Sequence, residues 1–126
     1  MFDLVQFINE GPEAQDKFAV AAGLPLIKDM SREERYQMIV NMLAHASEEL
    51  NGEVRAHVVR RPWKVGEQGC LDTGLHKQMF MDELFDVLLF IRAALAYAGF
   101  TGEEFAQIAN QKLHYNSVRE DHKTNV

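Results

Sequence analysis

The sequence has little cysteine, proline and glycine, and less positive than negative charge. Its 126 residues include 1 Cys, 3 Pro and 8 Gly, and 13 Lys and Arg stand against 19 Asp and Glu, for a formal net charge of −6. The single Cys70 excludes an internal disulfide and fits a reducing compartment. A broad surface for a nucleic-acid polymer is not expected, because such binding depends on clustered Lys and Arg.

Signals for membrane spans and for strands are lacking as well. The apolar run of Phe80–Ala98 is interrupted by Asp86 and Arg92 before it reaches the ~18 to 20 residues that a span needs. Met1–Leu4 carries no basic region of the kind that opens a signal peptide, so we expect a cytoplasmic protein without a membrane anchor. Only Val54–Val59 resembles the alternation of a half-buried strand, and the helix signal before it overrides that pattern.

Helical periodicity dominates the chain. Its length predicts a single domain, residues 1–126, that buries roughly two thirds of the surface of the unfolded chain. Capping boxes, glycines and prolines set the expected helix ends. We expect helices over Phe2–Asn9, from about Pro12 to Gly23, from the capping box of Ser31 and Glu34 to before Pro62, over Phe80–Ala98 with Gly99 as C-cap, and from the capping box of Thr101 and Glu104 to about Arg119. The predicted fold class is all-α, a four- to five-helix bundle with a long loop over Pro62–Gly74.

Two acids stand inside the most apolar of these helices. Glu83 and Asp86, three residues apart, share one face of the helix. Unpaired carboxylates are costly to bury, so a cation beside them is the simplest explanation. Because the rest of this helix is apolar on nearly every face, we also expect a second subunit to cover it, in a homodimer or homotetramer.

A second acidic group, Glu48, Glu49 and Glu53, lies on the preceding long helix. If the two helices pack antiparallel, carboxylates of both meet, and two like charges about 4 Å apart repel by roughly 4 kcal/mol at an effective dielectric near 20. Such a cluster requires a divalent ion or a shifted pKa, and oxygen ligands suit Mg²⁺, with Mn²⁺ as a substitute. The alternative is that these three glutamates form a solvated helix face. The predicted metal ligands are Glu49, Glu53, Glu83 and Asp86.

Two further groups could meet a nucleotide. One stripe of the last helix, formed by Lys112, Asn116 and Arg119, offers hydrogen-bond donors to a phosphate or a nucleobase. The alternative is structural, because the helix dipole favours Lys and Arg side chains near a helix C-terminus in any case. Trp63 and Lys64 open the loop, where the indole could stack on a base and the ammonium could neutralise phosphate. Equally, Trp63 could anchor a helix end.

Together these motifs resemble the all-α nucleoside triphosphate pyrophosphohydrolases, which include MazG-like enzymes, dimeric dUTPases and phosphoribosyl-ATP pyrophosphohydrolases. The resemblance covers roughly residues 31–119: DELFDVLLFI contains the E-x-x-D motif as Glu83 and Asp86, and QKLHYNSVRE contains K-x-x-x-N-x-x-R. The Trp63-Lys64 pair resembles a substrate-side element of the dUTPase branch. The first motif departs from the family pattern, because E-x-x-E from Glu49 would place its second acid at Gly52, and the chain has Glu53 instead.

The resemblance implies hydrolysis of a (deoxy)nucleoside triphosphate to the monophosphate and diphosphate, for control of the nucleotide pool. Mg²⁺ would be held by the four predicted ligands, and Glu48 or Glu49 would act as general base. The substrate would be bound by Trp63, Lys64, Lys112, Asn116 and Arg119. Phosphoribosyl-ATP hydrolysis and a non-enzymatic helical interaction module remain as alternatives, whereas a di-iron bundle would need His ligands at spacings that the sequence lacks.

Overall fold

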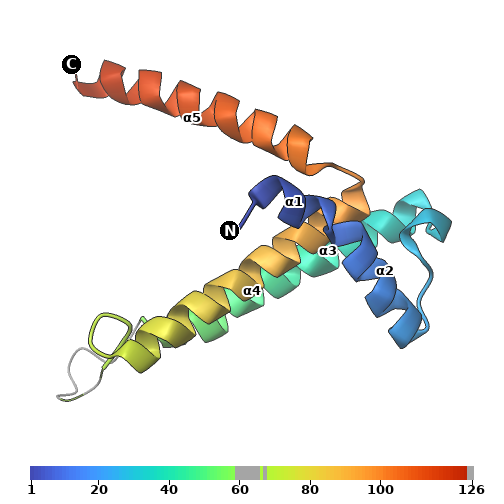
Figure 1. Ribbon diagram of the computed structural model, residues 1–126, viewed down its shortest axis with the longest axis horizontal. Helices are drawn as coiled ribbons and strands as arrows, with labels where there is room; N and C mark the ends of the chain where they lie inside the picture. Colours follow the sequence, from blue (N-terminus) through green and yellow to red (C-terminus); the bar gives the residue numbers. More distant parts are fainter. Residues whose placement is uncertain (59–65, 67, 125–126) are drawn as a thin grey trace.

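A computed structural model describes residues 1–58, 66 and 68–124, with side chains described as far as Val118. Every regular element in these ranges is helical, which confirms the all-α class for the described part of the chain. In chain order the elements are α1 (Leu4–Asn9), α2 (Gly11–Ala22), the 3-10 turn η1 (Ile27–Asp29), α3 (Arg32–Glu49), the π-helical turn η2 (Leu50–Val54), α4 (Gly74–Ala98) and α5 (Gly102–Thr124) (Figure 1).

Several helix ends follow the local chemistry that the sequence predicts. The Ser31 hydroxyl accepts from the Glu34 amide at 3.1 Å, and the Glu34 carboxylate accepts from the Ser31 amide at 3.0 Å. Thr101 and Glu104 form the same reciprocal pair at 3.1 and 2.9 Å. Each box satisfies two amides that the helix start would otherwise leave unpaired. Gly99 ends α4 in the left-handed region, at φ 80°, where a glycine carries no steric cost.

Two other helix ends differ from the prediction by more than two residues. Helix α4 begins at Gly74 rather than Phe80, because the Thr73 hydroxyl accepts from the His76 amide at 3.1 Å and supplies an N-cap. Helix α5 continues to Thr124 instead of ending near Arg119. For α4 and α5 the cause is the same: the sequence at these ends, GLHKQM and EDHKT, has few apolar residues and so adds little of the apolar periodicity on which the prediction rests.

An antiparallel hairpin of α3 and α4 forms the body of the molecule (Figure 1). On α4 the small side chains Ala93, Ala94 and Ala96 are buried, and small contact residues allow helix axes to approach closely. Tyr97, only 1% exposed, is the largest fully buried side chain. Its hydroxyl donates to Gln15 Oε1 on α2 at 3.1 Å, so the buried phenol has a hydrogen-bond partner.

The two N-terminal helices pack on α4. Phe7 of α1 contacts Phe85, with ring centroids 5.4 Å apart, and the Arg92 guanidinium lies 4.5 Å from the Phe7 ring centre. Gly11, at the start of α2, is pressed against Arg92, since a Cβ there would come within 2.8 Å of Arg92 Cγ. These contacts fix α1 and α2 over α4, with the Arg92 side chain of α4 packed against both.

Helix α5 leaves the body as an arm (Figure 1). In the described part of the chain, α1 is the one helix with more than marginal contact to it. The Asn9 side chain joins the two, accepting from the Gly102 amide at 2.7 Å and donating to Glu103 Oε1 at 2.6 Å. No single helix in the described ranges is long and apolar enough to cross a membrane; α4 and the part of α5 up to Val118 meet that test only as a pair bent by 114°.

Large apolar side chains remain exposed on both helices of the hairpin. On α3 and η2 they recur at alternating spacings of four and three, broken only by Ser47, and so follow one line along the helix. We call this line the α3 seam; it consists of Tyr36, Val40, Leu43 and Leu50. On α4 the exposed apolar side chains include Met81, Leu84 and Leu88. The chain by itself therefore leaves its central hairpin only partly covered.

Candidate metal centre and adjoining cavity

The hairpin brings together three of the four predicted metal ligands. Glu49 is the last residue of α3, and Glu83 and Asp86 lie three apart on α4, which runs antiparallel beside it. One carboxylate oxygen from each residue lies within 4.8 Å of the others, and all three side chains are half-buried. Three negative charges thus converge on one point between two helices. We call these three residues the carboxylate cluster.

The environment of the carboxylate cluster disfavours negative charge. Partial burial raises the pKa of Glu83 above its usual value, and the neighbouring charges of Asp86, Glu49 and Glu53 raise it further. Glu49 Oε2 is fully buried without a hydrogen-bond partner. A buried oxygen of this kind is expensive unless it is paired. A cation between the helices would satisfy this oxygen and offset the repulsion, so the residues present fit a hard divalent ion.

Two predicted acids lie outside the carboxylate cluster. Glu48, a candidate general base, is exposed, and its Oε2 lies 3.7 Å from His45 Nδ1. Glu53 lies on η2 and is also exposed, but it is near enough for its charge to act on Glu83. Of the candidates on the long helix, Glu49 alone contributes an oxygen to the cluster.

A cavity of about 450 Å³ adjoins the carboxylate cluster, and Glu49 and Asp86 form part of its wall. Its other lining residues are mainly apolar, from α2, α3 and α4: Gln15, Phe18, Met42, His45, Leu89, Phe90, Arg92 and Ala93. His45 stacks on Phe90, with ring centres 5.4 Å apart. Carboxylates at one edge of an apolar cavity with a few polar groups are a common arrangement for binding a small organic substrate.

Arg92, His45 and Gln15 line this cavity, although the sequence did not mark them as site residues. Arg92 is half-buried, and its Nε has no hydrogen-bond partner. A signal for Arg92 was available, because it is a charged side chain inside an apolar run, the same criterion that selected Glu83 and Asp86. No comparable signal marks Gln15, which reaches the cavity only because α2 crosses α4.

Comparisons of the chain with protein-family models, with curated proteins and with solved structures found no match. The side chains that the fold brings together, and the resemblance of the motifs to those of all-α pyrophosphohydrolases, are therefore the basis on which a function can be proposed.

The two predicted substrate-binding residues whose side chains the structure describes, Lys112 and Asn116, lie away from the carboxylate cluster of their own chain. Lys112 and Asn116 are exposed on the α5 arm, which packs on α1 rather than on the cluster-bearing hairpin. Arg119 belongs to the same helix, but its side chain is beyond those described. Trp63 and Lys64 lie outside the described residues.

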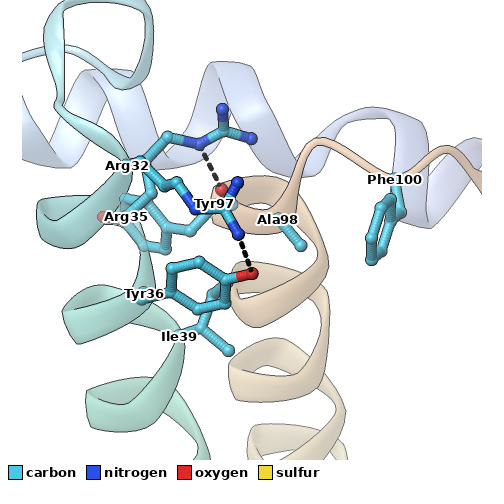
Figure 2. A pocket seen from close by; sticks show the side chains of 7 residues that line it. All are labelled: Arg32, Arg35, Tyr36, Ile39, Tyr97, Ala98 and Phe100. Carbon is cyan, nitrogen blue, oxygen red and sulfur yellow. Dashed lines mark hydrogen bonds between the residues drawn. The ribbon is translucent and has the colours of Figure 1, made fainter.

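A second cavity, of about 470 Å³, lies at the other end of the hairpin (Figure 2). Its α3 side consists of Arg32, Arg35, Tyr36 and Ile39, and Arg32 donates to the Tyr36 hydroxyl at 3.3 Å. Its remaining lining residues are Tyr97, Ala98 and Phe100. This lining contains no carboxylate, so it offers no ligand set for a cation. The cavity beside the carboxylate cluster is the better candidate for hydrolytic chemistry.

Proposed function

We propose that the protein is a Mg²⁺-dependent (deoxy)nucleoside triphosphate pyrophosphohydrolase. The observation that carries this proposal is the convergence of Glu49, Glu83 and Asp86 at the edge of an apolar cavity. The E-x-x-D motif of the resembled family supplies two of these residues. The specific fold is proposed to be a MazG-like or dimeric-dUTPase-like bundle completed by homo-oligomerisation, acting in the cytoplasm to control the nucleotide pool.

The carboxylate cluster would hold the cation. Its donors are all carboxylate oxygens, which suit Mg²⁺ and, as a substitute, Mn²⁺. A divalent ion bound there supplies charge neutralisation at phosphate oxygens and acidifies water. In its absence, burial and, after it, the repulsion of the neighbouring carboxylates raise the pKa of Glu83.

The chemical step would transfer the α-phosphoryl group to water. The water oxygen forms a bond to the α-phosphorus, the bond from that phosphorus to the α–β bridging oxygen breaks, and diphosphate leaves. The proton of the attacking water passes to a carboxylate that acts as general base. Glu49 is better placed than Glu48 for this role, because Glu49 lines the cavity whereas Glu48 faces His45 outside the cluster.

The cavity would hold the nucleoside while the phosphates extend toward the carboxylate cluster. Phe18, Leu89 and Phe90 provide apolar and aromatic surface for a base and sugar. Arg92 supplies a cation on the same wall as Asp86, where a guanidinium can pair with a phosphate oxygen. Gln15 adds an amide group for hydrogen bonding to the sugar or base.

A homo-oligomer is part of the proposal. The α3 seam, with Val40 58% exposed, and the uncovered apolar residues of α4 supply the hydrophobic surface that an interface between subunits needs.

An oligomer would also give the α5 arm a function. Lys112 and Asn116 lie on a helix that does not pack on the carboxylate cluster of its own chain. We propose that they reach the substrate held by another subunit, with Lys112 neutralising phosphate and Asn116 hydrogen-bonding sugar or base. Arg119, Trp63 and Lys64 keep their proposed substrate-binding roles.

A screen of diphosphate release tests the proposed activity. The purified protein is incubated with each common NTP and dNTP, with dUTP and with phosphoribosyl-ATP, in Mg²⁺ and in EDTA. We expect Mg²⁺-dependent release from at least one nucleotide, lost in Glu83→Gln and in Asp86→Asn, with helical circular dichroism unchanged. Asp82→Asn is the matched control, because Asp82 is an exposed α4 neighbour outside the carboxylate cluster. Full activity in either cluster variant would contradict the assignment.

The second candidate is a non-enzymatic helical interaction module. The exposed α3 seam favours it, because a line of large apolar side chains is typical of helix pairing. This alternative leaves the carboxylate cluster without a ligand and therefore predicts that Mg²⁺ does not change the melting temperature. Release of phosphoribosyl-AMP and diphosphate from phosphoribosyl-ATP alone would instead select that branch of the resembled family.

A further inference from the structure

Two histidines meet at the end of the hairpin where α4 begins. His57, which follows the end of η2, is 8% exposed, and apart from Tyr97 it is the one buried side chain with a polar group among the described residues. Its Nδ1 lies 3.3 Å from Nδ1 of His76, a half-buried residue in the first turn of α4. The two residues are nineteen positions apart in the chain. We call them the histidine pair.

Backbone hydrogen bonds hold both members of the histidine pair in place. The His57 amide donates to the Val54 carbonyl at 3.1 Å, and the His57 carbonyl accepts from the Cys70 amide at 2.8 Å. The His76 amide donates at 3.1 Å to the Thr73 hydroxyl, which caps α4. Folding thus brings the two imidazoles together, and a ligand that binds both of them has less conformational entropy left to overcome.

The distance between the two nitrogens fits a shared metal ion. Hydrogen bonds from N–H groups usually have lengths of about 2.7 to 3.2 Å, so a direct bond of 3.3 Å would be long. Two imidazole nitrogens on one tetrahedral Zn²⁺, each about 2.0 to 2.1 Å from the ion, lie about 3.3 to 3.4 Å apart. At the right angles of octahedral or square-planar coordination, the same bonds would bring the nitrogens to about 2.9 Å. The observed distance therefore favours a tetrahedral ion.

The orientation of the rings is also compatible with a shared ion. The ring centres are 5.6 Å apart, farther than the Nδ1 atoms, so the rings meet by these nitrogens and do not stack face to face. A rotation about χ2, a broad torsion in histidine, directs both lone pairs to an ion beside the line between them. In the part of the chain that the structure describes, no third His, Cys, Asp or Glu completes a group with the pair, so water would fill the remaining positions.

The histidine pair is separate from the carboxylate cluster. His76 precedes Glu83 by seven residues, which is two turns of α4 or about 10 Å along its axis. The donor atoms differ as well, because imidazole nitrogen suits Zn²⁺ whereas Mg²⁺ takes oxygen ligands. The two places can therefore be occupied by different ions independently of each other.

We propose that His57 and His76 form a Zn²⁺ site that joins the end of η2 to the start of α4. The ion binds Nδ1 of each histidine and takes water at its open positions. This inference goes beyond the proposed function and does not depend on it, since the ligands, the ion and the place in the hairpin all differ. Because the ion closes a loop between residues far apart in the chain, its binding also stabilises the native state.

Isothermal titration calorimetry of the full chain with Zn²⁺ tests the site, in excess Mg²⁺ that competes for the carboxylate cluster. We expect one Zn²⁺ per chain and a Zn²⁺-induced rise in melting temperature. His57→Gln and His76→Gln should each weaken Zn²⁺ binding by more than about tenfold, since even an outer partner of a metal ligand is commonly worth that much. His114→Gln is the matched control, because His114 is exposed on α5, and it should bind as wild type does.

Nitrogen NMR of the wild-type protein provides a test that needs no folded variant. Zn²⁺ should shift the Nδ1 signals of His57 and His76 and leave the other three of the five histidines unchanged. If circular dichroism shows that a variant is unfolded, these signals decide. Nδ1 signals that do not respond to Zn²⁺ would overturn the inference and leave the pair hydrogen-bonded only.

Zn²⁺ binding that persists in both folded histidine variants would also overturn the site. The proposed function is tested separately, through Glu83→Gln. This variant should keep the Zn²⁺ affinity of wild type, because Glu83 lies outside the histidine pair. Zn²⁺ binding without Mg²⁺-dependent diphosphate release in the wild-type protein would contradict the proposed function alone.

Discussion

The Arg35 side chain donates from Nε to the carbonyl oxygen of Tyr97 at 2.7 Å (Figure 2). Arg35 lies in the second turn of α3, and Tyr97 lies next to the last residue of α4. The bond satisfies one of the carbonyls that a helix C-terminus leaves unpaired and places a cation at the negative end of the helix dipole. One side chain thereby ties the start of α3 to the end of α4.

We predict that Arg35→Ala lowers the free energy of unfolding by about 1 to 3 kcal/mol, because it leaves the Tyr97 carbonyl without its charged donor. Urea unfolding followed by circular dichroism measures the change. Arg32→Ala is the matched control, since Arg32 is about one turn away and, among the residues that the structure describes, its side chain bonds within α3, to the Tyr36 hydroxyl. We expect it to cost less than about 1 kcal/mol. Equal losses in the two variants would contradict the capping role of Arg35.

Stability should depend on pH through Glu83. Its pKa is raised in the folded protein by burial and by neighbouring carboxylates. At pH values between the pKa of Glu83 in the unfolded state and its pKa in the folded state, the native state therefore binds more protons than the unfolded state. Without divalent cations, stability should therefore fall as the pH rises through this window and level off above it. Thermal melts of wild type and Glu83→Gln in EDTA measure the effect, and Glu83→Gln should show the weaker pH dependence.

Mg²⁺ should reverse this loss. Binding to the native state alone stabilises by about 2.7 kcal/mol at a Mg²⁺ concentration 100 times the dissociation constant. The gain requires ionised carboxylates, so we expect it to be full above the raised pKa of Glu83 and to disappear as the pH falls through that pKa. A Mg²⁺-induced rise in melting temperature that Glu83→Gln and Asp86→Asn both retain would argue against the carboxylate cluster as the binding site.

A charge in the α3 seam should weaken self-association. Val40 and Leu43 are 58% and 52% exposed at the middle of the seam, where a buried carboxylate would lack a partner. We expect Val40→Asp or Leu43→Glu to shift the protein to monomer in sedimentation velocity, with helical content retained. Gln37→Glu adds the same charge on an exposed α3 position outside the seam and should leave the assembly unchanged. A monomeric wild-type protein would contradict the proposed oligomer.

Subunit mixing should reveal whether α5 serves the site of another chain. Glu83→Gln and Lys112→Ala, each inactive alone, are co-refolded in equal amounts and assayed for diphosphate release. In a dimer with sites shared between chains, each mixed pair contains one site with both native residues, so about a quarter of wild-type activity should return. Sites built within one chain would give no recovery. A Lys112→Ala protein with full activity would remove Lys112 from the site.

The elements that the sequence predicted well are those with local causes. The Ser31 and Thr101 capping boxes and the Gly99 C-cap depend on side chains within a few residues, and all three are formed as expected. The start of α4 at Gly74 was missed, because its first turns mix two exposed apolar residues, Leu75 and Met79, with polar ones and so carry only a weak apolar signal. The π turn was missed too. The spacing of Glu49 and Glu53 by four residues fits a solvated acidic face of a regular α-helix just as well as a turn with one extra residue.

Part of the candidate site was also predictable from local sequence. Glu83 and Asp86 stood out because they interrupt an apolar run, and the structure places both in the carboxylate cluster. The choice among the three glutamates of the long helix was beyond the sequence, because it depends on where α3 meets α4. Gln15 joins the cavity only through the crossing of α2 over α4, whereas Arg92 carried the same signal as Glu83 and Asp86, a charge inside an apolar run.

By itself the sequence determined the helical class, the capped helix ends and the two acids that interrupt an apolar helix. Each of these depends on chemistry within one or two turns of the chain. The tertiary structure decided that Glu49 is the residue that joins them, that a cavity opens beside them, and that Lys112 and Asn116 lie on an arm directed away from them. These relations depend on distances between segments far apart in the chain, which only the packing of α2, α3 and α4 and the docking of α5 on α1 establish.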